Sequence, residues 1–148
     1  MGLRERINEE IKVAMKAHEA ESLATLRLLL SAVRQREVDE RITLDDAGVI
    51  AVVEKMIKQR KDSIEQFEKA ARKDLADKEK AEMALLQGYL PAQLAPAEVE
   101  AIIAEAIGAS GAKTAADMGK VMGLVKPKLA GKADMGKVSS LIKARLAV

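Results

Sequence analysis

The stretch "MGKVMGLVKPKL", residues 118–129, decides the fold class of this chain. Five apolar side chains recur in it at i, i+3, i+4, i+7 and i+11, namely Met118, Val121, Met122, Val125 and Leu129. This spacing places them on one stripe of an α-helix. We expect the helix to begin at the Thr-x-x-Asp pair Thr114 and Asp117. Pro127 should kink or end it near Lys126, because proline lacks the amide hydrogen that a helix interior needs.

Similar helical patterns flank this stretch on both sides. Upstream, Pro96 suits the first turn of a helix that Gly108 would stop. Downstream, Asp134 is a suitable cap for a last helix. The expected inward residues of these two helices are Val99, Ile102, Ile103, Ile107, Val138, Leu141, Ile142 and Leu146. Together the three segments predict a small three-helix bundle.

Residues 88–96, "GYLPAQLAP", interrupt the helical patterns. Gly88, Pro91 and Pro96 lie close together, charge is absent, and the composition changes here from charge-dense to rich in alanine and glycine. Such a stretch is typical of a connection between domains. We therefore expect a Pro/Gly hinge at about 91–96, joining an N-terminal helical domain (1–92) to a C-terminal one (93–148).

Four helices are expected before the hinge, over about 3–18, 21–41, 44–72 and 75–90. Ser22 and Asp74 would cap the second and fourth, and Thr43 with Asp46 resembles a capping box for the third. The expected inward residues include Ile7, Ala14, Met15, Leu26, Leu30, Val33, Val38, Val49, Val53, Met56, Ile57, Ile64, Phe67, Met83, Leu86 and Leu90. Since no alternating strand pattern is found, the expected fold class is all-α: a four-helix domain and a three-helix bundle.

The composition excludes several classes of protein. The chain has no cysteine and one histidine, so a disulfide framework and a structural zinc site are not expected. No segment approaches the roughly 18 apolar residues of a membrane span. The N-terminus "MGLRERINEE" has charges where a secretory signal needs an apolar run. We expect a cytoplasmic protein with no membrane contact, no metal and no cofactor.

The positive charge is concentrated near the C-terminus. Residues 1–90 hold 17 Lys+Arg against 18 Asp+Glu, whereas residues 113–148 hold 8 against 2. An excess of this kind attracts polyanions, although a solvated basic surface has the same composition.

The segment "GKADMGKVSS", residues 131–140, resembles a phosphate-binding loop. Such a loop needs a preceding strand and a Ser or Thr after the lysine. Here Val138 follows Lys137, and the preceding segment has a helical pattern. A nucleotide site is therefore not expected, although the helix that starts after Asp134 could favour an anion.

Glycine stands directly before lysine at Gly119-Lys120 and again at Gly136-Lys137. Gly119, Gly123 and Lys126 recur at i, i+4 and i+7, beside the apolar stripe. Each helical glycine costs roughly 1 kcal/mol relative to alanine and exposes backbone. The bare backbone would permit close approach either of another helix or of a phosphate backbone.

No catalytic constellation is found in the sequence. His18 is the only imidazole, lies on the edge of an apolar stripe, and suits a packing role better than a catalytic one. Ser139 and Lys143 could suggest a nucleophile pair, but no oxyanion loop is evident. Two aromatic residues, Phe67 and Tyr89, are too few for base stacking, so any RNA would be held through its backbone and shape.

Three stretches carry a family resemblance: "LRLLLSAVRQREVDER", "QFEKAARKDLADKEKAEMALLQGYLPAQLAPAEVE" and "DMGKVMGLVKPKLAGKADMGKVSSLIKARL". They resemble the YqeY proteins across essentially the whole chain. The third is also similar to the tail domain of GatB, a subunit of the glutamine-dependent tRNA amidotransferase, a carbon–nitrogen ligase. That tail is thought to hold tRNA, while the enzyme's chemistry lies in parts that this chain lacks.

The resemblance implies a tRNA-binding accessory protein without its own catalytic centre. The expected RNA-binding residues are Gly119, Lys120, Gly123, Lys126, Lys128, Gly131, Lys132 and Lys137. Two alternatives stay open at this point. One is a protein–protein interaction module that docks through its N-terminal helices, and the other is an amidotransferase-like enzyme.

Overall fold

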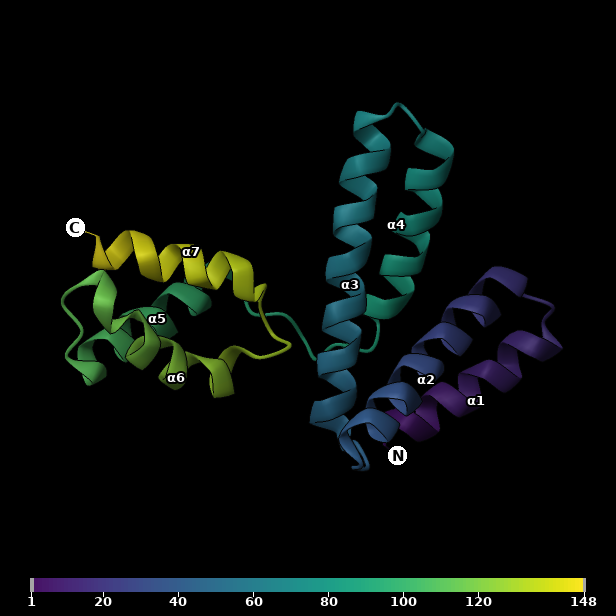
Figure 1. The fold of residues 1–148 in the computed structure, drawn as a ribbon, viewed down its shortest axis with the longest axis horizontal. Helices are drawn as coiled ribbons and strands as arrows, with labels where there is room; N and C mark the ends of the chain where they lie inside the picture. The colour runs from purple at the N-terminus through teal and green to yellow at the C-terminus, as the bar shows by residue number, and fades with distance from the viewer. Residues whose placement is uncertain (1, 148) are drawn as a thin grey trace. The chain divides into compact units, whose positions relative to one another are not determined.

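The computed structural model describes residues 2–147, and the chain in this range is α-helical (Figure 1). No residue between 2 and 147 lies in a β-strand, which confirms the all-α class. None of these helices combines the length and the apolar character that a membrane crossing requires. The helices are α1 (Leu3–Lys16), α2 (Ala20–Glu40), α3 (Asp46–Lys69), α4 (Lys73–Gln87), α5 (Pro96–Ser110), α6 (Met118–Leu129) and α7 (Met135–Leu146), with a 3₁₀ turn η1 (Ala115–Asp117) before α6.

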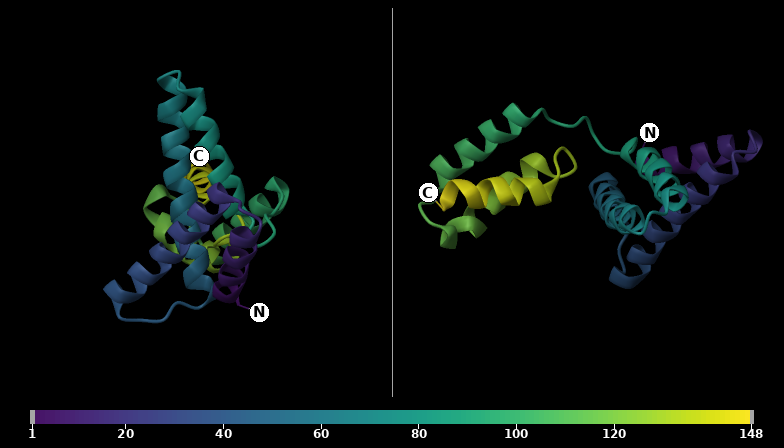
Figure 2. Two further views of the ribbon diagram at one scale, coloured as in Figure 1. Left: turned by 90° about the vertical axis from the view of Figure 1, so that its right-hand side faces the viewer. Right: turned by 90° about the horizontal axis from the view of Figure 1, so that it is seen from above.

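The chain forms two compact units, one ending at Leu90 and the other beginning at Pro91. Each unit has its own apolar core. In the first unit, α1 pairs with α2 and α3 pairs with α4, as two helical hairpins (Figures 1 and 2). Their shared core includes Ile7, Leu26, Leu29, Val33, Val49, Val53, Met56, Ile57 and Leu86.

Two carboxylates hold the start of α1 and the connection between α2 and α3 together. The Glu37 side chain pairs with Arg4 and accepts a hydrogen bond from Leu44 N at 2.7 Å. These two hydrogen bonds hold the pKa of Glu37 below its ordinary value, because both favour the ionised form. Asp46 Oδ1 accepts from Leu3 N at 3.0 Å, so a residue of α3 caps the first turn of α1.

The capping box expected from Thr43 and Asp46 is wrong. Asp45 is the cap of α3, and its side chain accepts from Gly48 N at 2.9 Å. Asp46 instead caps α1 by accepting from Leu3 N. These residues are 43 positions apart, so the local sequence does not indicate the contact.

Tyr89 ties the end of α4 to α1. It is 3 % exposed, its hydroxyl donates to Glu10 Oε2, and the Arg6 guanidinium lies 4.5 Å from the centre of its ring. Burial, reinforced by the hydrogen bond to Glu10, raises the pKa of Tyr89 well above its ordinary value.

Other local predictions for the first unit are corrected by the structure. Helix α2 starts at Ala20, before the expected cap Ser22, and α4 starts at Lys73, before the expected cap Asp74. Val38 and Met15, which the apolar patterns placed inward, are 72 % and 51 % exposed. Their helices carry apolar residues on several sides, so tertiary contacts decide which side is buried.

The packing role expected of His18 is also wrong. His18 lies beyond the end of α1, is exposed, and has a φ of 56°. It belongs to the turn between α1 and α2 rather than to the apolar stripe of a helix.

In the second unit, α5, α6 and α7 surround one core. Val121, Val125 and Leu129 are fully buried, as the opening stripe predicts, and they pack with residues of α5 and α7. The remaining buried members are Val99, Ile103, Ala106, Val138, Ile142 and Leu146.

Pro127 does not end the helix as one form of the expectation had it, because α6 continues to Leu129 with Pro127 inside it. The proline falls in the last turn, where it removes a single backbone bond. The carbonyl that would have accepted this bond belongs to Gly123, which is exposed and therefore accessible to water.

Candidate nucleic-acid interface

The charge of the second unit differs from helix to helix. Residues 113–148, which include α6 and α7, contain eight basic and two acidic side chains. The unit's other acidic residues, Glu98, Glu100 and Glu105, are exposed on α5. A polyanion is therefore attracted to α6 and α7 and repelled by α5.

Gly119, Gly123 and Lys126 share one face of α6. At about 100° per residue they lie within about 60° of one another around the helix. All three are exposed, and they lie largely opposite the buried Val121 and Val125. We call these three residues the glycine strip.

The two glycines of the strip face open space. A Cβ added at Gly119 or at Gly123 would meet no atom within 4 Å, apart from its own helix backbone and chain neighbours. Close packing against another helix of this unit is therefore not what these glycines provide. They leave bare helix backbone on the surface at a cost of about 0.5–1 kcal/mol each relative to alanine.

Lys120 extends the strip on one side. Its side chain is 70 % exposed, and its Nζ lies 3.8 Å from Asp117 Oδ1. Asp117 accepts hydrogen bonds from the backbone N–H groups of Lys113 and Thr114, which hold the pKa of its carboxyl below the ordinary value. The ionised Asp117 carboxylate thus holds the turn before α6 through these two backbone hydrogen bonds. Its negative charge also attracts the ammonium group of Lys120.

Lys128, Lys132 and Lys137 are exposed but lie outside the strip. Lys128 lies about 140–180° around α6 from the two glycines. Lys132 is in the turn between α6 and α7, and Lys137 is in the first turn of α7. The eight residues expected to bind RNA therefore do not form one continuous face.

Gly131 has a structural role in the turn. It is buried and has a φ of 75°, a left-handed conformation that glycine adopts readily. Its carbonyl accepts from Gln93 Nε2 at 2.6 Å, and the neighbouring carbonyl of Lys132 accepts from Leu94 N at 2.9 Å. Gln93 and Leu94 thus hold the turn that presents Lys132, a role that no sequence pattern pointed to.

The N-terminus of α7 is capped by the protein itself. Asp134 Oδ1 accepts from Gly136 N at 2.9 Å and from Lys137 N at 3.4 Å. An anion at this position would compete with the Asp134 carboxylate for the same N–H groups. Val138 is 1 % exposed and belongs to the core, which removes the resemblance to a nucleotide loop.

Comparison with known proteins places this chain among proteins of one family. The model of the family described as Yqey-like protein matches residues 4–146. The proteins named Altered inheritance of mitochondria protein 41, mitochondrial, are similar. The one from Vanderwaltozyma polyspora is 38 % identical over 85 residues, covering 57 % of this chain and 46 % of the relative. The one from Pyrenophora tritici-repentis is 30 % identical over 132 residues, covering 86 % and 71 %.

Coverage differs between these relatives. A third relative of the same name, from Eremothecium gossypii, is 36 % identical over 101 residues, 68 % of this chain and 55 % of the relative. The chain thus spans about half the length of the Vanderwaltozyma and Eremothecium proteins.

The expected cytoplasmic location is contradicted by these relatives, whose names describe them as mitochondrial. The charged residues of "MGLRERINEE" are compatible with several compartments, so they do not select the cytoplasm.

Proposed function

Because the chain belongs to the YqeY-like family, and because α6 and α7 present an exposed basic surface, we propose that it is an RNA-binding accessory protein that contacts tRNA or a related RNA. The observation that carries the proposal is the glycine strip, with open space above two helical glycines and an exposed lysine beside them. For its location we propose the mitochondrial setting that the names of the relatives state.

The proposal includes a relation to glutamine-dependent amide transfer on tRNA. It is supported by the resemblance of residues 117–146 to the GatB tail domain. In this proposal the carbon–nitrogen ligase chemistry belongs to other subunits, and this chain contributes RNA binding. We also propose that residues 1–92 and 93–148 act as separate domains joined by a Pro/Gly hinge.

The chemistry of the surface suits the RNA backbone. Lysines bind phosphates as point charges, and a bare helix backbone lets a phosphodiester chain approach more closely than side chains would. Both aromatic residues of the chain, Phe67 and Tyr89, lie in the first unit, so α6 and α7 offer no ring for a base to stack on. The RNA bound in this way is recognised by shape, as a duplex stem is.

The test is binding of fluorescently labelled tRNA across a salt series, measured by anisotropy. If Lys120, Lys126, Lys128, Lys132 and Lys137 contact five phosphates, the slope of log K against log salt should be about −3.5 to −4.5. Changing these five lysines to Gln should remove most of the affinity and flatten the slope.

A matched control removes the same charge elsewhere. The residues Lys12, Lys16, Lys55, Lys58 and Lys73 are exposed lysines of the first unit, and their change to Gln should leave binding nearly unchanged. Equal losses in the two variants would show that binding follows net charge alone. The proposal is wrong if tRNA binding is undetectable at low salt, or if the α6–α7 variant binds as the wild type does.

A further inference from the structure

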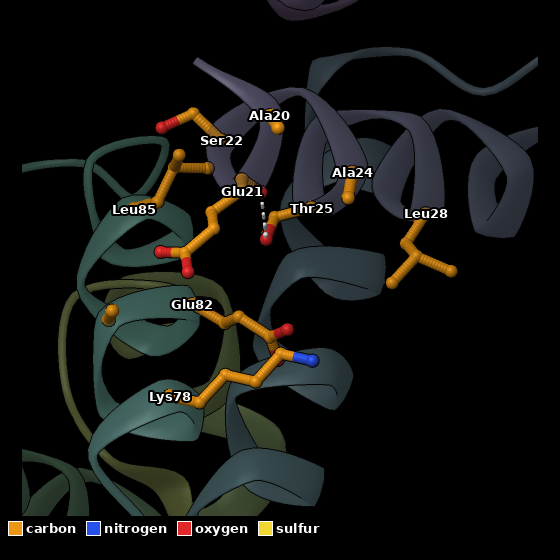
Figure 3. A pocket seen from close by; sticks show the side chains of 10 residues that line it. Ala20, Glu21, Ser22, Ala24, Thr25, Leu28, Lys78, Glu82 and Leu85 are labelled. Carbon is orange, nitrogen blue, oxygen red and sulfur yellow. Dashed lines mark hydrogen bonds between the residues drawn. The ribbon is translucent and has the colours of Figure 1, made fainter. Parts of the chain in front are cut away.

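A cleft of about 370 Å³ lies between α2 and α4 in the first unit (Figure 3). Its volume is within the range of about 300–1,000 Å³ that ligand-binding clefts occupy. It lies in a different unit from the lysines of α6 and α7, so its role can be tested separately from RNA binding.

Helix α2 has a second apolar side that faces this cleft. Its core side carries Leu26 and Leu29, whereas Ala20, Ala24 and Leu28 line the cleft at i, i+4 and i+8. The two sides are about 170° apart around the helix. Leu28 is 50 % exposed, so a large apolar side chain remains available at the cleft.

Helix α4 forms the opposite wall with the same kind of spacing. Lys78, Ala81, Glu82 and Leu85 line the cleft at i, i+3, i+4 and i+7. Between two such walls, the small side chains Ala24 and Ala81 leave room in the middle and larger ones stand at the margins. A groove between two helices with this pattern has the shape that receives a third helix.

The charged groups at the cleft favour a cationic occupant. The carboxylates of Glu21 and Glu82 both point into the cleft (Figure 3), against the single ammonium group of Lys78. Arg60 Nε lies 3.5 Å from Glu82 Oε2, so its positive charge offsets part of the negative charge of the two carboxylates. The Thr25 hydroxyl already donates to the Glu21 carbonyl at 3.2 Å, so the polar group at the floor is satisfied.

We propose that this cleft docks a basic amphipathic helix of a partner protein. The lining spans Ala20 to Leu28 on α2, about 12 Å of helix, which corresponds to about two turns of the bound helix. Apolar residues of the partner at i, i+3 or i+4, and i+7 pack against Leu28, Leu85 and the alanines. A Lys or Arg on its flank meets the carboxylates of Glu21 and Glu82.

Peptide selection tests the chemistry of the occupant directly. A library of random 16-residue peptides displayed on phage is selected against the full chain, with removal of binders to the Leu28→Arg variant. We expect the recovered peptides to carry apolar residues at helical spacing together with Lys or Arg.

A recovered peptide is then synthesised with a fluorescent label, and its binding is measured by anisotropy. The Leu28→Arg change should weaken binding about tenfold or more, because it places a charge where an apolar contact forms. Glu21→Lys should weaken it as well, and a version of the peptide with Glu in place of Lys and Arg should bind poorly. Circular dichroism checks that each variant is folded, which is expected because Glu21 and Leu28 are exposed.

Val38 supplies the matched control. It is an exposed apolar residue of the same helix, outside the cleft, so Val38→Arg adds the same charge without touching the lining. Peptide binding should be unchanged in this variant, and tRNA binding should be unchanged in all three.

Several outcomes would overturn the proposal. The selection could yield no peptide above background, or the recovered peptides could be acidic or lack apolar residues at helical spacing. Leu28→Arg and Val38→Arg could also weaken peptide binding equally. Sedimentation of the wild type gives another: a dimer that Leu28→Arg converts to a monomer would show that a second copy of the chain, not a partner protein, occupies the cleft.

Discussion

Replacing the two glycines of the glycine strip by alanine should stabilise the second unit and weaken RNA binding. Alanine fits at both positions, since an added Cβ meets no atom within 4 Å and neither glycine has a positive φ. Gly123 lies in the middle of α6, where the gain is about 1 kcal/mol. Gly119 lies in the first turn, where about half of that is expected, so the double variant should gain about 1.5 kcal/mol.

Urea unfolding followed by circular dichroism measures this gain. The midpoint should rise while the slope stays unchanged, because the surface exposed on unfolding is nearly the same. In the tRNA assay, the same variant should bind about three- to tenfold more weakly with an unchanged salt slope, since the methyl groups obstruct the backbone without changing charge.

Two other glycines provide the controls for this experiment. Gly108 is a helical glycine of α5 with open space around it, so Gly108→Ala should stabilise the unit and leave RNA binding alone. Gly111 also has open space but a φ of 68°, so Gly111→Ala should destabilise the unit by about 1 kcal/mol. Loss of stability in the Gly119/Gly123 double variant would refute the structural reasoning. A gain in stability with unaltered RNA binding would refute the proposed role of the strip.

Three further predictions concern stability. Tyr89→Phe should cost about 1 kcal/mol in urea unfolding, because Glu10 loses a hydrogen-bond donor while remaining half exposed to water. Glu37→Gln should destabilise the fold at pH 7. The pKa of Glu37 is lower in the folded state than its ordinary value of 4.5, so the ionised side chain stabilises the fold and this contribution is lost on protonation. The stability difference between variant and wild type should therefore shrink as the pH falls below 4.5. Ile103→Ala should cost about 2–5 kcal/mol in urea unfolding, because its side chain is fully buried in the second core.

Each of these has an outcome that would contradict it. A Tyr89→Phe variant as stable as the wild type would show that the hydrogen bond to Glu10 adds nothing. If the effect of Glu37→Gln is the same at pH 3 and pH 7, the pair with Arg4 does not depend on ionised Glu37. A small effect of Ile103→Ala would mean that the three helices around this residue collapse into the space it leaves.

The sequence predicted the helices well where a single apolar stripe is present. In α6 the stripe selects Val121, Val125 and Leu129, and all three are fully buried. In α2 apolar residues occur on several sides, and Val38 and Leu28 lie exposed. Periodicity identifies a helix in both cases, but where the apolar side is broad it does not say which part the neighbouring helices cover.

The sequence predicted which residues belong to the candidate site, but not how these residues are arranged in space. The sequence pointed to glycine beside lysine and to the charge excess of residues 113–148. It did not place Lys128 across the helix from the strip, because Pro127 was expected to kink or end the helix before this residue. It also could not show that Gly131 is enclosed in a turn held by Gln93, because that contact joins residues 38 positions apart and the local pattern carries no signal for it.

The sequence by itself determined the all-α class, the buried stripe of α6 and the accumulation of lysines toward the C-terminus, because these follow from local periodicity and composition. Only the tertiary structure decided that Gly119 and Gly123 face open space, that Asp46 caps α1, and that α2 and α4 enclose a cleft. The physical reason is that a helix has a continuous surface. Which part of it is buried, capped or left open depends on elements distant in sequence.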